Sequence, residues 1–227
     1  MNEDGSFKEI KFGKKIYKGR KFFDYVDRRA RLAYLHRRRQ DLDFMYFLWC
    51  GLLSPIAGRE FHTFERSFLK DEKTWQEPSD FYYNLIDDEK ICDAVLEEFD
   101  LNPKTGHIIN GHVPVLVNKG ETPIKANGKA FVIDGGFSRP YHKKTGISGY
   151  TLISNSHGMR LLRHEQIADI YIALKENKDI ESDSEIVEIR SERTTIGDTD
   201  HGKEIKDEIA GLHRLLQAYQ SGKLQPK

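Results

Sequence analysis

The first twenty residues alternate apolar and polar positions. In SFKEIKFGKKIYKG, residues 6–19, the apolar side chains Ile10, Phe12 and Ile16 are separated by charged ones, and Gly13 stands between the two halves. Alternation of this kind is typical of β-strands, and a glycine suits the tight turn that joins them. The pattern predicts a β-hairpin at the start of the chain.

The pattern then changes to helical spacing. From Gly19 to Gln40, apolar residues recur every three or four positions and arginines fill the other face, which predicts one helix. Arg37 to Arg39 would be the solvated end of that helix. The next stretch, Asp43 to Leu53, is apolar enough to be buried, and Ser54-Pro55 would end it.

A loop-rich aromatic connection, residues 56–86, precedes another helix. Acidic residues 87–89 mark its first turn, and Ile91, Val95 and Phe99 would form its apolar side. The region of about 20–100 therefore looks like a helical insertion.

Short β signals follow, close together and separated by glycine-rich turns. Strands so closely spaced favour antiparallel pairing, and together with the helices they predict an α+β fold. These strands are predicted in PIKA (123–126), KAFVID (129–134), GYTLIS (149–154) and MRLLRH (159–164), and a separate short strand is predicted in HII (107–109).

The last part of the chain, residues 165–227, is predicted to hold a charged linker, centred on residues 177–200, and a terminal amphipathic helix. Apolar residues in that helix are spaced by four and three, a heptad stripe that needs a partner. It could pack on its own domain or form a helix–helix contact in a homo-oligomer. The stripe consists of Ile205, Ile209, Leu212, Leu216 and Tyr219.

Composition limits the class of protein. The 227 residues include 36 basic and 36 acidic ones, but the first 40 hold thirteen Lys and Arg against five Asp and Glu. That basic segment makes nucleic-acid binding conceivable, yet pairing with the acidic C-terminal part is the simpler interpretation. No apolar run is long enough to cross a membrane, and the polar N-terminus is no signal peptide. The two cysteines suggest no disulfide framework, which favours the cytoplasm.

Two stretches could carry chemistry. In HIINGHVPV, residues 107–115, Asn110-Gly111 would form a turn after a strand, so that His112 either caps the turn or binds a metal ion. Residues 134–144 place cationic groups after a Gly-Gly turn, a combination suited to a phosphate ester or equally to an ordinary basic surface turn. These groups are Arg139, His142, Lys143 and Lys144.

Longer strings carry a family resemblance. IINGHVPV, WCGLLSP and the stretch KGETPIKANGKAFVIDGGFSRPYHKKTGISGYTLISNSHG resemble class III fructose-1,6-bisphosphatases, the bacterial, metallophosphoesterase-like type. The resemblance implies a calcineurin-like fold, of which residues 1–164 would be the C-terminal portion of the catalytic domain. It also implies a binuclear Mn²⁺ centre that hydrolyses fructose 1,6-bisphosphate in gluconeogenesis, with His112 as one metal ligand. The substrate would be contacted by Arg139, His142 and Lys143.

The resemblance is incomplete in one respect. The family's Asp-x-His, Gly-Asp-x-x-Asp and Gly-Asn-His-Asp motifs are absent from this sequence. Most ligands of the binuclear centre would therefore lie outside it, in an N-terminal part of the same enzyme. We expect the 227-residue chain alone to be inactive, either as a fragment of the phosphatase or as a non-catalytic module that retains sugar-phosphate binding or subunit association.

Overall fold

The chain folds into two compact units, each built from two stretches of sequence. Residues 1–110 and 123–132 form the first unit, and residues 111–122 and 133–227 form the second. The computed structural model describes residues 1–51, 53–56, 62–111, 113–136, 138–147, 149–165, 170–177 and 182–224, without the side chains of Arg139, His142 and Ile170. No helix within these ranges is long and apolar enough to cross a membrane.

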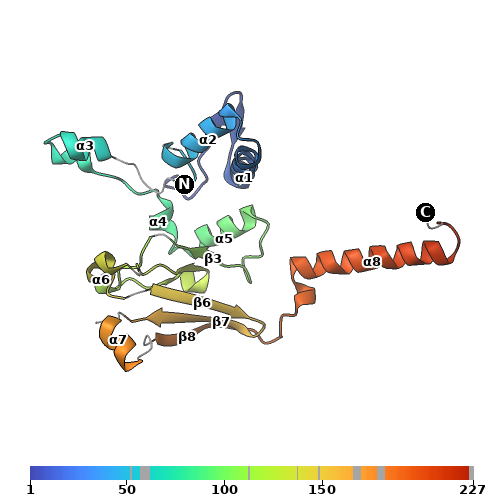
Figure 1. The fold of residues 1–227 in the computed structure, drawn as a ribbon. Helices are drawn as coiled ribbons and strands as arrows, with labels where there is room; N and C mark the ends of the chain where they lie inside the picture. The colour runs from blue at the N-terminus through green and yellow to red at the C-terminus, as the bar shows by residue number, and fades with distance from the viewer. Residues whose placement is uncertain are drawn as a thin grey trace. The chain divides into compact units, whose positions relative to one another are not determined.

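The first unit opens with the predicted hairpin. Strands β1 (Ile10–Phe12) and β2 (Lys15–Tyr17) are antiparallel, with Ile10 opposite Tyr17. Gly13 between them has a φ of 60°, a conformation that favours glycine. The hairpin prediction is confirmed (Figure 1).

Two helices follow where one was predicted. Helix α1 (Gly19–His36) ends because Arg37 adopts a left-handed conformation and donates its N–H to the Ala33 carbonyl. Helix α2 (Arg39–Cys50) begins two residues later, so the prediction of a single helix to Gln40 was wrong. The prediction that residues 43–53 are buried was only half correct, because one face of α2 is exposed.

The inner face of α2 packs on α1 and on the hairpin. Phe44 and Leu48 are buried, and the Phe44 ring lies 5.8 Å from that of Phe12. At the same interface the Arg29 guanidinium of α1 pairs with the buried Asp41 carboxylate of α2 at 3.0 Å. Aromatic packing and one ion pair therefore hold the two helices together.

The outer face of α2 is apolar as well. Its large side chains are spaced at i, i+3, i+4 and i+7, and all of them are exposed. They are Leu42, Met45, Tyr46 and Trp49, of which Trp49 is the most exposed at 76%.

The rest of the first unit consists of short helices and one long enough to carry a core. These are α3 (Thr63–Phe68), the 3₁₀ turn η1 (Glu72–Trp75), α4 (Tyr82–Leu85) and α5 (Glu89–Glu98). Asp88 caps α5 by accepting the Lys90 N–H, which confirms the predicted helix start. The deepest residues of α5 are Cys92 and Leu96, both 1% exposed, and the predicted apolar side next to them, Ile91, Val95 and Phe99, is half-buried.

A three-stranded sheet closes this unit. Strand β5 (Ala130–Val132) lies between β3 (Ile108–Asn110) and β4 (Ile124–Lys125), and the turn η3 (Ala126–Gly128) joins β4 to β5. The β4–β5 pair is antiparallel as predicted, whereas β3 and β5 run parallel. The core includes Ile86, Cys92, Ala126 and Ala130.

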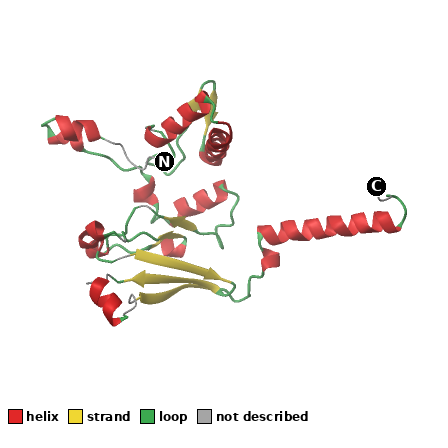
Figure 2. Ribbon diagram, viewed as in Figure 1, coloured by secondary structure: helices red, strands yellow, loops and turns green. Residues whose placement is uncertain are grey.

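The second unit is built on an antiparallel sheet. Strands β6 (Gly149–Asn155), β7 (Gly158–His164) and β8 (Ser182–Ile189) lie side by side in that order (Figure 2). Strand β8 lies inside the segment predicted as a linker, so that prediction was wrong there. The unit also contains η2 (Val117–Lys119), α6 (Arg139–Thr145), α7 (Ile170–Glu176), η4 (Ile196–Asp198) and α8 (Asp200–Gln220).

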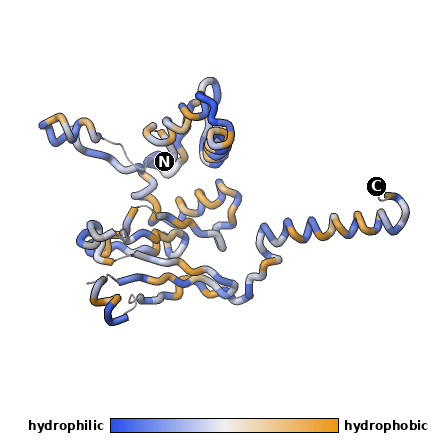
Figure 3. The backbone as a smooth tube through the Cα atoms, viewed as in Figure 1, coloured by the Kyte–Doolittle hydropathy of each residue, from blue (hydrophilic) through white to orange (hydrophobic). Residues whose placement is uncertain are grey.

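Helix α8 confirms the predicted terminal helix. Thr199 caps it by accepting the Gly202 N–H, and Thr195 and Asp198 form a capping box around η4 just before it. Apolar positions recur along its whole length (Figure 3).

Candidate functional site

The parallel strands β3 and β5 end on the same side of their sheet, and the candidate site residues follow those two strand ends. Asn110 and Val132 are partners at the carboxyl ends of these strands. Because parallel strands end at the same edge, the segments that begin at Gly111 and Ile133 leave the sheet from one side. In open α/β sheets, ligands commonly bind outside the carboxyl ends of the strands. The segments that leave the sheet at this edge contain His112 and the basic stretch 134–144.

Within the second unit, these two segments are hydrogen-bonded to each other. The Val115 N–H donates to the Asp134 carbonyl at 2.7 Å. Further along, the Asn118 side-chain amide donates to the Lys143 carbonyl at 3.1 Å. The segment that follows His112 is therefore fixed against the loop that follows β5.

Local constraints shape that loop. The Asp134 carboxylate accepts the Gly136 N–H at 2.8 Å, which forms an Asx turn. A side chain at Gly135 would lie 2.6 Å from the Cα of Gly149, so only glycine fits there. At the other end the fully buried Thr145 donates its hydroxyl to the Ile147 carbonyl at 2.9 Å. Both ends of the loop are thus fixed by close contacts.

Of the predicted site residues, the structure describes some completely, some by their backbone alone, and one not at all. His112 lies outside the described residues, and so do the side chains of Arg139 and His142, although their backbone belongs to α6. Lys143 is exposed on the same helix, and the neighbouring Lys144 ammonium lies 5.9 Å from the Tyr141 ring. Their roles in binding metal or substrate stay predictions.

The described side chains do not form a metal centre by themselves. Among them no group of three or more His, Cys, Asp or Glu is arranged to hold an ion. A binuclear centre needs several such ligands on each ion. The part of the chain that the structure describes therefore does not fit that centre on its own.

The last residue of β3 is fixed from within the first unit. The Tyr82 hydroxyl donates to the Asn110 side-chain oxygen at 2.9 Å, while the amide nitrogen of Asn110 is buried without a partner among the described atoms. Burial raises the pKa of Tyr82, so its hydroxyl remains a donor. Asn110 is thus a strand residue, not the turn residue predicted, and its anchoring position was not evident from the sequence.

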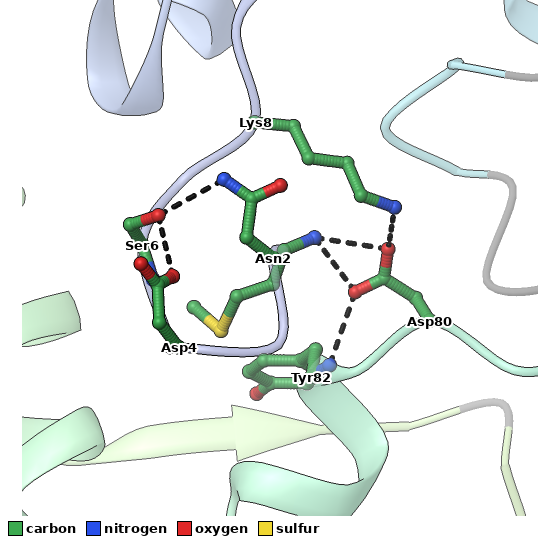
Figure 4. Close-up of polar contacts among 7 residues, drawn as sticks. Asn2, Asp4, Ser6, Lys8, Asp80 and Tyr82 are labelled. Atoms are coloured by element: carbon green, nitrogen blue, oxygen red, sulfur yellow. Dashed lines mark hydrogen bonds and ion pairs between the residues drawn. The ribbon is translucent and has the colours of Figure 1, made fainter.

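Asn110 also borders a cavity of about 400 Å³ that lies in the first unit. Its polar wall includes Asp80, whose carboxylate accepts bonds from the Lys8 ammonium at 2.9 Å and the Tyr82 N–H at 3.0 Å (Figure 4). The Met1 amino group donates to it as well, at 2.8 Å. Burial alone would raise the pKa of Asp80, but these bonds outweigh it and lower the pKa.

Comparison with known sequences supplies the family. The model of a protein family described as Firmicute fructose-1,6-bisphosphatase matches residues 1–221, which is nearly the whole chain. The chain belongs to this family. This confirms the resemblance found in the sequence.

Relatives named fructose-1,6-bisphosphatase class 3 agree. The relative from Fusobacterium nucleatum is 46% identical over 98% of this chain and 35% of its own length. Those from Clostridium botulinum strain Hall and Bacteroides thetaiotaomicron are 47% and 45% identical and are matched over 34% and 35% of their length. The chain thus spans about a third of the curated relatives it matches. No solved structure matches it.

Proposed function

We propose that this chain contributes to a fructose-1,6-bisphosphatase, which hydrolyses fructose 1,6-bisphosphate to fructose 6-phosphate and phosphate in gluconeogenesis. The observation that carries the proposal is the family match over residues 1–221. Because the relatives are about three times as long as the matched region, catalysis would need polypeptide beyond these 227 residues.

The fold we propose for the complete enzyme is that of a calcineurin-like metallophosphoesterase. Support comes from the parallel strands β3 and β5. The two segments that follow these strands are hydrogen-bonded to each other, between Val115 and Asp134. His112 would be one ligand of a binuclear Mn²⁺ centre, and residues outside this chain would supply most others. Ions bound there would polarise the phosphate ester. This chain would supply the residues on either side of His112, with Asn110 hydrogen-bonded to Tyr82 in the first unit and Val115 hydrogen-bonded to Asp134 in the second.

Helix α6 would provide the contact to the phosphate that is not being hydrolysed. Arg139, His142 and Lys143 lie on this one short helix, which Asn118 ties to the His112 segment. Arginine can bind a phosphate with two parallel hydrogen bonds, whereas lysine acts as a point charge.

The alternative is a non-catalytic module that retains sugar-phosphate binding or subunit association. The lack of a three-ligand metal group among the described residues favours it for the isolated chain. We place the protein in the reducing cytoplasm, in keeping with the free thiols of Cys50 and Cys92.

A chimera tests the enzymatic proposal. The chain would replace the matched third of the F. nucleatum relative, and phosphate release from fructose 1,6-bisphosphate would be measured with Mn²⁺. We expect hydrolysis by the chimera and none by the 227-residue chain. A chimera that unfolds cooperatively but releases no phosphate would refute the proposal, and turnover by the chain alone would refute the need for further ligands.

Two substitutions in the chimera test His112 as a metal ligand and Arg139 as a contact to the substrate. His112→Ala should lower bound manganese and activity together, whereas the control His107→Ala, a histidine bonded to the Gly128 carbonyl, should leave the metal content unchanged. Arg139→Ala should raise KM for fructose 1,6-bisphosphate about tenfold and leave KM for a small aryl phosphate unchanged. Lys144→Ala serves as its control.

A further inference from the structure

The apolar stripe of α8 lies open along the whole helix. Its residues follow the heptad spacing, and a sixth apolar residue widens the stripe near the C-terminus. Each side chain is between 37% and 64% exposed: Ile205, Ile209, Leu212, Leu215, Leu216 and Tyr219.

Within the described part of the chain, only the first two turns of α8 contact the segment that precedes the helix. A side chain at Gly202 would lie 1.8 Å from the Ile196 carbonyl oxygen, and the Lys206 ammonium donates to the Gly197 carbonyl at 2.8 Å. Both contacts are to η4, directly before the helix. In proteins most of the stability of a helix comes from the packing of its apolar face, and α8 has 21 residues, of which only Gly202 is buried. The remaining turns therefore need a partner for their apolar face.

Charge is distributed unevenly along this helix. Residues 200–210 hold four acidic side chains and two basic ones, a net charge of −2. Residues 211–224 hold two basic side chains and no acidic one, a net charge of +2. An identical helix running the other way would place each half opposite its complement, whereas a parallel copy would place like charges together.

We propose that α8 pairs with α8 of a second copy of this chain in an antiparallel, two-fold symmetric contact. Leu212 would lie at the centre, and Ile205 of one copy would face Tyr219 of the other. In a symmetric contact of this kind each residue pair occurs twice, so one stripe serves as both surfaces. Burial of the stripe supplies the affinity, and the charges, being exposed and screened, select the orientation.

Antiparallel pairing also aligns the helix dipoles favourably, because the N-terminus of each helix lies near the C-terminus of the other. The proposal does not depend on the phosphatase activity, since it uses only the exposure, spacing and charge of α8.

Cross-linking with a short bismaleimide tests both partner and direction. The exposed Cys50 would be replaced by serine in every sample, while Cys92 is retained because it is buried and its pKa is raised to about 11. Ile205→Cys and Tyr219→Cys would be treated separately and as an equimolar mixture. We expect a cross-linked dimer only in the mixture, and one in Leu212→Cys alone.

Other outcomes would overturn the proposal. If Ile205→Cys and Tyr219→Cys each cross-link to themselves, the helices pair in parallel or associate non-specifically. If Leu212→Cys also stays monomeric, α8 does not meet a second copy, and its partner is another protein or another part of the enzyme.

Matched charge substitutions give a second, independent measurement. Leu212→Glu places a charge in the stripe, and Gln217→Glu places the same charge on the same helix but outside the stripe. By light scattering after size-exclusion chromatography, we expect Leu212→Glu to raise the dimer dissociation constant at least tenfold and Gln217→Glu to leave it unchanged. Equal behaviour of the two variants would refute the pairing.

Discussion

Helices α2 and α8 both expose an apolar face, but they depend on it differently. Helix α2 has a second face, which buries Phe44 and Leu48 and the carboxylate of Asp41. Helix α8 has no such face among its described contacts, because only Gly202 is buried. One helix therefore has a buried face that holds it in the fold, whereas the other has only the apolar face that lies exposed.

The difference shows that exposed apolar residues do not all have the same meaning. On α2 they are extra surface on an element that is already anchored to α1. On α8 they are the main apolar surface that the helix has. Substitutions should accordingly act on the folding of the first unit when they fall on the inner face of α2, and on association when they fall on the stripe of α8.

The largest effect should come from the inner face of α2. Phe44→Ala should lower the free energy of unfolding of the first unit by about 3 kcal/mol, because a large buried ring is lost and a cavity remains. The control Tyr46→Ala, on the outer face and 65% exposed, should change it by less than about 0.5 kcal/mol. Urea denaturation followed by tryptophan emission measures both, and equal losses would contradict the distinction between the two faces.

The second-largest effect should come from the ion pair between Arg29 of α1 and Asp41 of α2. Asp41→Ala leaves the Arg29 guanidinium without its carboxylate in a mostly buried place, at a cost of about 2 kcal/mol. In the control Asp27→Ala, an exposed pair with Arg31 is lost, which should cost about 0.5 kcal/mol or less. If urea denaturation gives the two variants the same stability, the Arg29–Asp41 pair does not hold α1 to α2.

A smaller and local effect is expected at the start of α8. Thr199→Ala removes the hydroxyl that accepts the Gly202 N–H and should cost about 1 kcal/mol. That cost corresponds to about fivefold faster hydrogen exchange in the first turns of α8. Exchange in α2 should not change, and Gln217→Ala, far from the cap, serves as the control. Unchanged exchange in Thr199→Ala would show that the cap does not limit opening of the helix.

The smallest effect concerns pH. The pKa of Asp80 in the folded chain is lowered below its ordinary value of 3.8, so its bonds contribute stability above that value. This contribution is lost as the pH falls below about 3.8 and through the lowered pKa, when the carboxylate takes up a proton. Melting temperatures at pH 5 and pH 3 should differ less in Asp80→Asn than in the unchanged chain. An equal drop in both would assign the acid sensitivity to other groups.

Much of the secondary structure could be predicted because it depends on local pattern. The hairpin around Gly13, the cap of α5 at Asp88 and the heptad stripe of α8 are encoded by spacing and by residue type. The break at Arg37 could not be predicted, since a left-handed arginine has no signature in the sequence. Strand β8 was missed because it is mostly exposed, so no buried face imposes an alternating pattern on residues 182–189.

Pairing and contacts across long distances in the sequence were less predictable. The position of the candidate site followed from a short motif, residues 110–112, and from a glycine-rich loop. The sequence of one segment does not determine which strand pairs with β3 or in which direction, because strand pairing depends on packing between distant segments. The bonds Val115–Asp134 and Asn118–Lys143, which hold the site segments together, are likewise products of the tertiary fold.

The path of the chain between the units has a consequence for proteolysis. The chain passes from one unit to the other three times, after residues 110, 122 and 132. A single cut after Asn110 would leave β4 and β5 on the C-terminal piece while their partner β3 stays on the N-terminal piece. The two pieces would therefore remain associated through a shared sheet. A chain nicked at this point should migrate as one particle under native conditions and as two bands only after denaturation.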